Sequence, residues 1–180
     1  MRSNPPSYSG AAKWLHWVTA VLILSLIPAG VAMTNMAEGP AQDRLYDLHR
    51  SFGMAVLVLT SARLFLRLRN GAPPPALFLT RLERRASVSV HHLLYLLLFL
   101  APVLGWLAMS AYGGDWAIFG FLKMPALIGK SEAAAKALFT AHKIAAFVIA
   151  GLVIAHIGGA LRHALIKQDG LIRRMLPGNR

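Results

Sequence analysis

The sequence predicts an all-α integral membrane protein, a four-transmembrane-helix bundle that forms a single domain over residues 1–180. Of its residues, 56% are hydrophobic and only 14% are charged, whereas about a quarter of the residues in a soluble domain are charged. Four apolar stretches, at about 14–33, 52–68, 93–112 and 138–166, reach or approach the roughly 20 residues that cross a bilayer. Most Lys and Arg residues lie at one set of helix ends, and the positive-inside rule therefore predicts that both termini are in the cytoplasm.

Composition excludes several other classes of protein. A net charge of +12 would suit nucleic-acid binding, but the charge surrounds four spanning segments, so we expect membrane lipid and no nucleic acid as a partner. Cysteine is absent, which excludes disulfides, iron–sulfur clusters and thiolate-bound haem. The first stretch exceeds the roughly 7–15 apolar residues of a signal peptide, so we expect a retained helix. Seven histidines in so apolar a chain are the feature to explain.

The first expected helix begins with KWLHW, whose two Trp residues suit the membrane interface. His16 lies just inside the lipid on the cytoplasmic side, and Gly30 follows it by fourteen residues on the same face. Residues 34–47 are expected to form an external loop.

The second helix is expected to start around LHRSFG, with His49 at its outer end. Gly53 lies one turn further along and leaves room for something flat. Arg63 follows His49 by fourteen residues. It can snorkel to the cytoplasmic surface or pair with the propionate of a haem, and the sequence does not choose between these readings. Residues 69–87 are expected to be a stiff, basic connection.

The third helix is expected to open with VHHLLY, which places His91 and His92 at its inner end. Pro102 is expected to kink it, and Gly105 follows His91 by fourteen residues. We interpret His92 as a polar residue at a wet interface. Residues 113–137 form the longest external loop, part of which is expected to lie on the membrane surface.

The fourth helix carries His142 and His156 within a mostly apolar run over residues 140–163. Fourteen residues are almost four turns, so both histidines share a face and lie about 21 Å apart. His163 follows two turns later and, taken alone, is interpreted like His92. The tail over residues 167–180 is expected to contact lipid headgroups or to fray.

Alternating helix direction places these histidines at two depths. We call His49 and His142, near the outer surface, the outer pair, and His16 and His156, near the inner surface, the inner pair. A haem b needs two neutral imidazoles at one depth on different helices, and helix bundles build cofactor sites from such facing side chains. Four histidines at two matched depths therefore predict two haem b groups, one near each membrane surface. His91 lies at the depth of His16, and spacing alone also allows it, rather than His156, to complete the inner haem.

Four segments carry a resemblance to a known family: KWLHWVTA, LHRSFGMAVLVLTSARLFLRL, HHLLYLLLFLAPVLGW and AHKIAAFVIAGLVIAHIGGALRH. With them the chain resembles the bacterial cytochrome b561 family over nearly its whole length. The resemblance implies the bacterial inner (cytoplasmic) membrane, and it implies that the last helix donates one ligand to each of two b haems. Carried onto this chain, the iron ligands are His16 and His156 inside, and His49 and His142 outside.

The resemblance also bears on the other histidines. The family has histidines that match His91 and His163, which are not ligands, and this implies a role for both in a quinone or proton path. The third-helix pair of the family is spaced differently from the adjacent His91 and His92, so the resemblance implies no role for His92.

Iron bound by two imidazoles has no open position, so the expected chemistry is the transfer of single electrons. The resemblance implies oxidation of superoxide on the outer side coupled to reduction of ubiquinone. The basic residues expected on the outer side can draw an anion toward the outer haem or merely solvate a loop; they are Arg50, Lys123, Lys130, Lys136 and Lys143. No catalytic residue is assigned.

Two other classes of function compete with this interpretation. One is a cytochrome b anchor subunit that relays electrons from a hydrogenase or formate dehydrogenase to quinone. Short loops and tails offer such a partner little docking surface, so we expect that an obligate protein partner is not required. The other is a haem-free transporter or channel, which predicts a colourless preparation.

Overall fold

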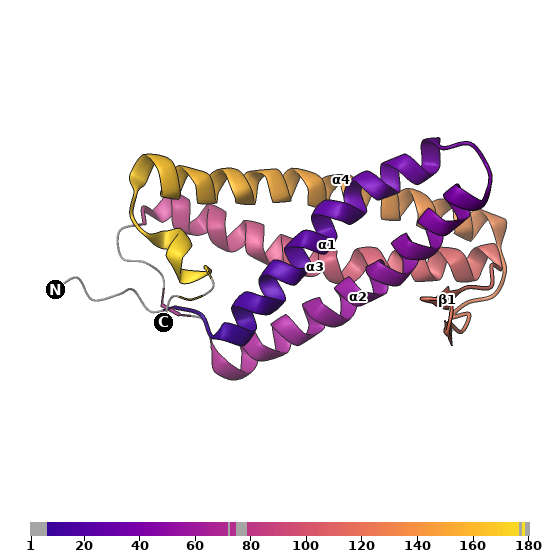
Figure 1. The fold of residues 1–180 in the computed structure, drawn as a ribbon, viewed down its shortest axis with the longest axis horizontal. Coiled ribbons are helices and arrows are strands. Elements are labelled where there is room, and N and C mark those ends of the chain that lie inside the picture. The colour runs from indigo at the N-terminus through magenta and orange to yellow at the C-terminus, as the bar shows by residue number, and fades with distance from the viewer. Residues whose placement is uncertain (1–6, 72, 75–78, 177, 179–180) are drawn as a thin grey trace.

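The computed structural model describes residues 7–71, 73–74, 79–176 and 178, and this part of the chain folds as four long antiparallel helices (Figure 1). In chain order they are α1 (Gly10–Asn35), α2 (Pro40–Asn70), α3 (Arg81–Tyr112) and α4 (Glu132–Leu161). A π-helical segment, η1 (Arg162–Lys167), continues α4, and a short 3-10 helix, η2 (Leu171–Arg174), follows. All four long helices have the length and composition to cross a membrane, as the sequence predicts.

The outward faces of the helices are apolar, as contact with lipid requires. Val58, Phe65 and Ile154 are 66%, 61% and 72% exposed. Large apolar side chains this accessible on every helix would form patches that a soluble monomer rarely presents. The protein is therefore an integral membrane protein whose lipid-facing surface is built from these side chains.

All four helices begin earlier than expected, and α2 and α3 do so by the most. α4 begins at Glu132, so residues 132–137 are helical rather than part of the loop expected over 113–137. α2 begins at Pro40, because proline suits the first turn of a helix, so residues 40–47 are helical rather than part of an external loop. α3 begins at Arg81, because Thr80 and Glu83 form a capping box. Its two reciprocal hydrogen bonds measure 3.3 Å, from the Glu83 N–H to Thr80 Oγ1, and 3.1 Å, from the Thr80 N–H to Glu83 Oε2. His49 and His91 therefore lie well inside their helices.

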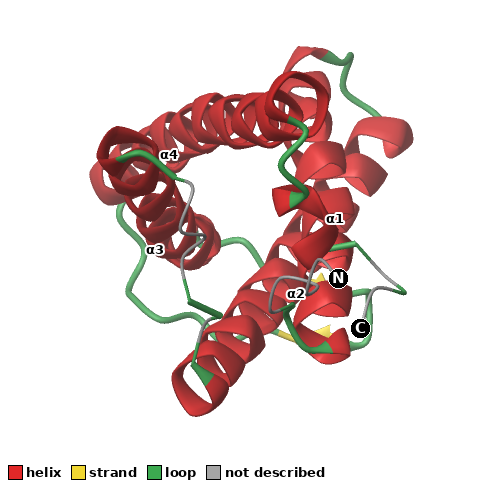
Figure 2. Cartoon of the chain, turned by 90° about the vertical axis from the view of Figure 1, so that its left-hand side faces the viewer, coloured by secondary structure: helices red, strands yellow, loops and turns green. Residues whose placement is uncertain are grey.

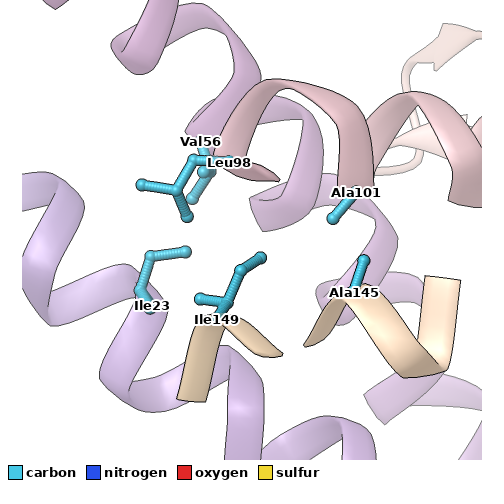
Figure 3. Close-up of a cluster of buried hydrophobic side chains, with 6 residues drawn as sticks. All are labelled: Ile23, Val56, Leu98, Ala101, Ala145 and Ile149. Atoms are coloured by element: carbon cyan, nitrogen blue, oxygen red, sulfur yellow. The ribbon is translucent and has the colours of Figure 1, made fainter. Parts of the chain in front are cut away.

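The bundle consists of two close helix pairs, with α3 along α4 and α1 along α2 (Figure 2). Extensive contacts between α2 and α3 join the pairs, whereas α1 and α4 touch at few points. Six buried side chains form the core between the pairs (Figure 3): Ile23, Val56, Leu98, Ala101, Ala145 and Ile149. α4 is therefore separated more widely from α1 than from α3.

The long loop between α3 and α4 folds over the ends of α2 and α3. Its strands, β1 (Ala117–Ile118) and β2 (Leu122–Lys123), pair antiparallel. Between them, the Phe119 N–H donates to Ser51 Oγ at 2.9 Å, and the Phe119 ring packs edge-on against Phe52 at 5.2 Å between centroids. The loop is therefore anchored to α2 rather than loosely attached.

The described part of the tail is also folded, so the expectation of a frayed end is wrong there. η2 turns back across the opposite end of the bundle, near the start of α1 (Figure 1). Trp17 Nε1 donates to the Met175 carbonyl at 2.9 Å, the Tyr8 N–H donates to the Arg174 carbonyl at 3.3 Å, and Arg174 donates to the Pro74 carbonyl at 2.8 Å. The tail is thus hydrogen-bonded both to the N-terminal region around α1 and to the connection between α2 and α3.

Candidate haem-binding site

The interior of the bundle has a regular layered arrangement. Each long helix contributes three residues at seven-residue intervals, and seven residues are almost two turns, or about 10 Å. We name three layers by their residues. The inner layer is His16, Arg63, His91 and His156; the middle layer is Ile23, Val56, Leu98 and Ile149; the outer layer is Gly30, His49, Gly105 and His142. The middle layer belongs to the buried core (Figure 3) and separates two polar layers.

The outer layer places the outer pair face to edge. The ring centroids of His49 and His142 lie 6.1 Å apart, with 79° between the ring planes. Nδ1 of His142 lies 2.8 Å from the backbone oxygen of Ala101 and donates to it. This hydrogen bond fixes the tautomer, because a proton on Nδ1 leaves the Nε2 lone pair available to a metal.

The two glycines of the outer layer lie directly against these rings. A Cβ on Gly30 would lie 3.2 Å from Cε1 of His49, and one on Gly105 would lie 3.3 Å from Nδ1 of His142. Any side chain at either position would press on a ring. Gly53, which the sequence suggested as the spacer, has nothing within 4 Å of an added Cβ. The close approach is made instead from α1 and α3.

The inner layer brings three histidines and one arginine together. The centroids of His16 and His156 lie 6.0 Å apart with 70° between planes, and His91 lies 5.1 Å from His156 with 89° between planes. Nδ1 of His91 donates to the backbone oxygen of Ser87 at 2.6 Å.

Arg63 turns into the bundle. Its NH2 nitrogen lies 3.1 Å from Nδ1 of His16, and its guanidinium carbon lies 5.4 Å from the centre of the Tyr95 ring. The Arg63 side chain thus contacts His16 inside the bundle and does not snorkel to the surface. The sequence alone could not distinguish these two orientations.

The remaining two histidines lie outside the layers. His92 is exposed and hydrogen-bonds the Val88 carbonyl at 2.8 Å. His163 lies in η1 and is 8% exposed, and its Nδ1 is 2.5 Å from Oδ2 of Asp169. His163 therefore interacts with the Asp169 carboxylate of the tail and does not contribute to any of the three layers.

Both pairs have the spacing that one metal ion between two imidazoles requires. A metal–imidazole nitrogen bond is about 2 Å, and a ring centre lies about 1 Å beyond its nitrogen, so the centroids should lie about 6 Å apart. The inner and outer pairs, at 6.0 and 6.1 Å, both fit. The inner pair joins α1 to α4, which make few contacts, and the outer pair joins α2 to α4, which do not pack along each other. This wider part of the bundle and the glycines beside the rings suit a flat macrocycle.

A four-helix membrane bundle with paired interior histidines is the architecture of a membrane cytochrome b. The chain belongs to the prokaryotic cytochrome b561 family, whose family model matches residues 7–178. This finding confirms the resemblance seen in the sequence, and membership of the family implies that the chain binds haem b.

Curated relatives match the chain over nearly their full lengths. Cytochrome b561 homolog 1 of Escherichia coli (strain K12) is 30% identical, and the match covers 94% of this chain and 97% of the relative. Cytochrome b561 homolog 2 of the same organism is 26% identical, with 97% and 93% covered. The probable superoxide oxidase CybB of Yersinia pestis is 27% identical, with 96% and 97% covered.

Proposed function

We propose that the chain is a diheme cytochrome b that transfers single electrons from superoxide, on the outer side of the bacterial inner membrane, to ubiquinone. The observation that carries the proposal is the equal spacing of the two histidine pairs, 6.0 and 6.1 Å, at two levels of one bundle. In the proposal His16 and His156 hold the inner iron, and His49 and His142 hold the outer iron. Bound haem b with two imidazole ligands supplies reversible one-electron chemistry and no open metal position.

The chain itself positions the proposed ligands. α4 supplies one histidine to each pair, so a single rigid helix sets the separation of the layers at about 21 Å. The Ala101 carbonyl orients His142 through its Nδ1–H, and Ile23, Val56, Leu98 and Ile149 keep the space between the layers apolar.

Two histidines could pair with His156 at the inner layer. The ring centroid of His16 lies 6.0 Å from that of His156, and the centroid of His91 lies 5.1 Å from it. The distance of 5.1 Å between the His91 and His156 centroids is nearly 1 Å shorter than the roughly 6 Å that two imidazoles on one metal ion require. The proposal therefore keeps His16 as the ligand. It places His91 beside the inner site, where, with His163, it would serve the quinone or proton path.

The choice of superoxide has two supports. One relative carries the name probable superoxide oxidase. The outer end of the bundle also carries cations that attract an anion, although Lys123 is partly neutralised by Asp115 at 3.5 Å and Arg50 is paired with Asp47 at 2.5 Å. The proposed orientation has both termini in the cytoplasm, because most basic residues lie at that end of the bundle.

The test is spectroscopic. Purified protein should show a reducible Soret band and two haems per chain, and mixing with superoxide under anaerobic conditions should reduce both haems before a ubiquinone analogue reoxidises them. Two haems without a response to superoxide would favour the anchor-subunit function, with a hydrogenase or formate dehydrogenase as the donor. One haem per chain would overturn the diheme proposal itself.

A further inference from the structure

The two helices that carry the inner pair are the least closely packed neighbours in the bundle. In the described part of the chain, α1 and α4 make fewer contacts than α1 with α2, α2 with α3 or α3 with α4. His16 of α1 and His156 of α4 are nevertheless the proposed ligands of one iron. The inner pair therefore depends on whatever keeps α1 beside α4. At that end of the bundle the chain itself crosses from α4 to α1, through residues 168–176, which we call the C-terminal strap (Figure 1).

The base of the C-terminal strap is fixed to α3 and α4. Glu83 of α3 forms ion pairs of 2.5 Å with both Arg162 and Lys167 of η1. Nδ1 of His163 lies 2.5 Å from Oδ2 of Asp169, and the Asp169 N–H donates to the His163 carbonyl at 3.4 Å. These contacts set the direction in which the strap leaves α4.

The other end of the C-terminal strap is bonded to α1 and to the residues just before it. Trp17 Nε1 donates to the Met175 carbonyl at 2.9 Å. The Arg174 carbonyl accepts from the Tyr8 N–H at 3.3 Å and from Ser7 Oγ at 3.4 Å. The strap thus joins the half of the bundle made by α3 and α4 to the start of α1.

We propose that the C-terminal strap holds α1 beside α4 and thereby sets how long the inner haem stays bound. The inference rests on the proposed ligand pairs. Trp17 follows His16 directly, and their ring centroids lie 5.4 Å apart, so the strap is bonded next to the ligand itself. When α1 moves away from α4, His16 separates from His156, whereas the outer pair lies on α2 and α4 and is not affected. Trp17 is therefore a positioning residue for His16.

The test measures haem loss from the full-length chain in detergent, as transfer to excess apomyoglobin. Trp17→Phe keeps an aromatic ring beside His16 and removes the hydrogen bond to Met175. In a His142→Ala background, which should hold the inner haem alone, Trp17→Phe should speed haem loss about three- to tenfold, the effect of one hydrogen bond. In a His16→Ala background, which should hold the outer haem alone, the same change should leave the rate unaltered.

Trp106→Phe is the matched control. Trp106 Nε1 also donates to a backbone carbonyl, that of Pro125, at 2.9 Å, but this bond joins α3 to the loop before α4 and does not reach α1. Its loss should leave the rate for the inner haem unchanged.

A second variant separates the C-terminal strap from local packing against His16. Asp169→Ala loosens the base of the strap, far along the chain from Trp17, and should speed loss of the same haem. Because both changes release one element, the double variant should lose the inner haem no faster than the faster single variant. Trypsin should also cleave the strap faster in both single variants than in their parent.

Three results would overturn the inference: equal loss of the inner haem in Trp17→Phe and Trp106→Phe, additive effects of Trp17→Phe and Asp169→Ala, or an acceleration that extends to the outer haem. A His142→Ala chain that holds two haems or none would instead reject the proposed ligand pairs, and the inference with them.

Discussion

Replacing Gly105 with alanine tests whether the outer layer is shaped for paired imidazoles. The added Cβ would lie 3.3 Å from Nδ1 and 3.4 Å from Cε1 of His142, so the ring must shift by a few tenths of an ångström. The ring has little freedom to do so while Nδ1 stays 2.8 Å from the Ala101 carbonyl. Without a ligand the ring can turn away, so the strain acts mainly on the bound state.

The magnitude follows from the cost of overpacking, which is about 1–3 kcal/mol. Since 1.4 kcal/mol is about tenfold in affinity, we expect the outer site to bind haem about 5- to 150-fold more weakly. The helix itself should gain up to about 1 kcal/mol, because alanine is a better helix former than glycine. The gain applies with and without ligand, so it does not restore the affinity.

The assay is haem titration with the two sites distinguished by their spectra, together with thermal unfolding. Gly151→Ala is the control, because it also lies inside a long helix but has nothing within 4 Å of the added Cβ. It should show the same gain in helix stability and no loss of haem. If Gly105→Ala kept the outer haem as well as Gly151→Ala does, the packing argument would be refuted.

Three further changes test other parts of the structure. His142→Ala should remove the outer haem and leave the inner one spectrally intact, measured as one haem per chain; unchanged stoichiometry would reject the ligand assignment. Thr80→Ala removes the capping hydrogen bond to the Glu83 N–H and should lower the stability of α3 by about 1 kcal/mol, seen as a lower unfolding temperature with haem content retained. Asp169→Ala removes the partner of the buried His163 and should expose the tail to trypsin; cleavage at the wild-type rate would show that this pair does not hold the tail.

The fold could be predicted from the sequence because its strongest signals are local. Apolar stretches of membrane length mark the four helices, and the spacing of fourteen residues from His142 to His156 places both on one face. Helix starts were less predictable. The first turns of α2 and α3 are polar, so hydropathy does not reveal them. Only Pro40 and the capping box at Thr80 mark where these helices begin.

The site could be predicted in part. The matching depths of His16 with His156 and of His49 with His142 follow from helix direction alone, and the structure brings both pairs to about 6 Å. The contact between Arg63 and His16 could not be predicted, because it depends on the rotamer of a long side chain that reaches either the surface or the interior.

The layered register is also present in the sequence as a seven-residue repeat within each helix. Ile23, Val56, Leu98 and Ile149 each lie seven residues from a polar-layer position on both sides, a repeat that a search for histidines alone passes over. The Ala101 carbonyl could not have been found this way, because a backbone oxygen leaves no mark in the residue pattern.

The contrast between the layers gives the two sites different properties within one frame. All four helices keep the same seven-residue register, so the difference lies in what α1, α2 and α3 contribute beside the histidines of α4. At the outer layer, Gly30 and Gly105 add no side chain, and His49 and His142 face each other without another polar ring. At the inner layer, the equivalent positions on α2 and α3 carry Arg63 and His91, which crowd the inner pair with a cation and a third imidazole. The outer layer is thus defined by the space beside its two rings, and the inner layer by polar contacts around its histidine pair.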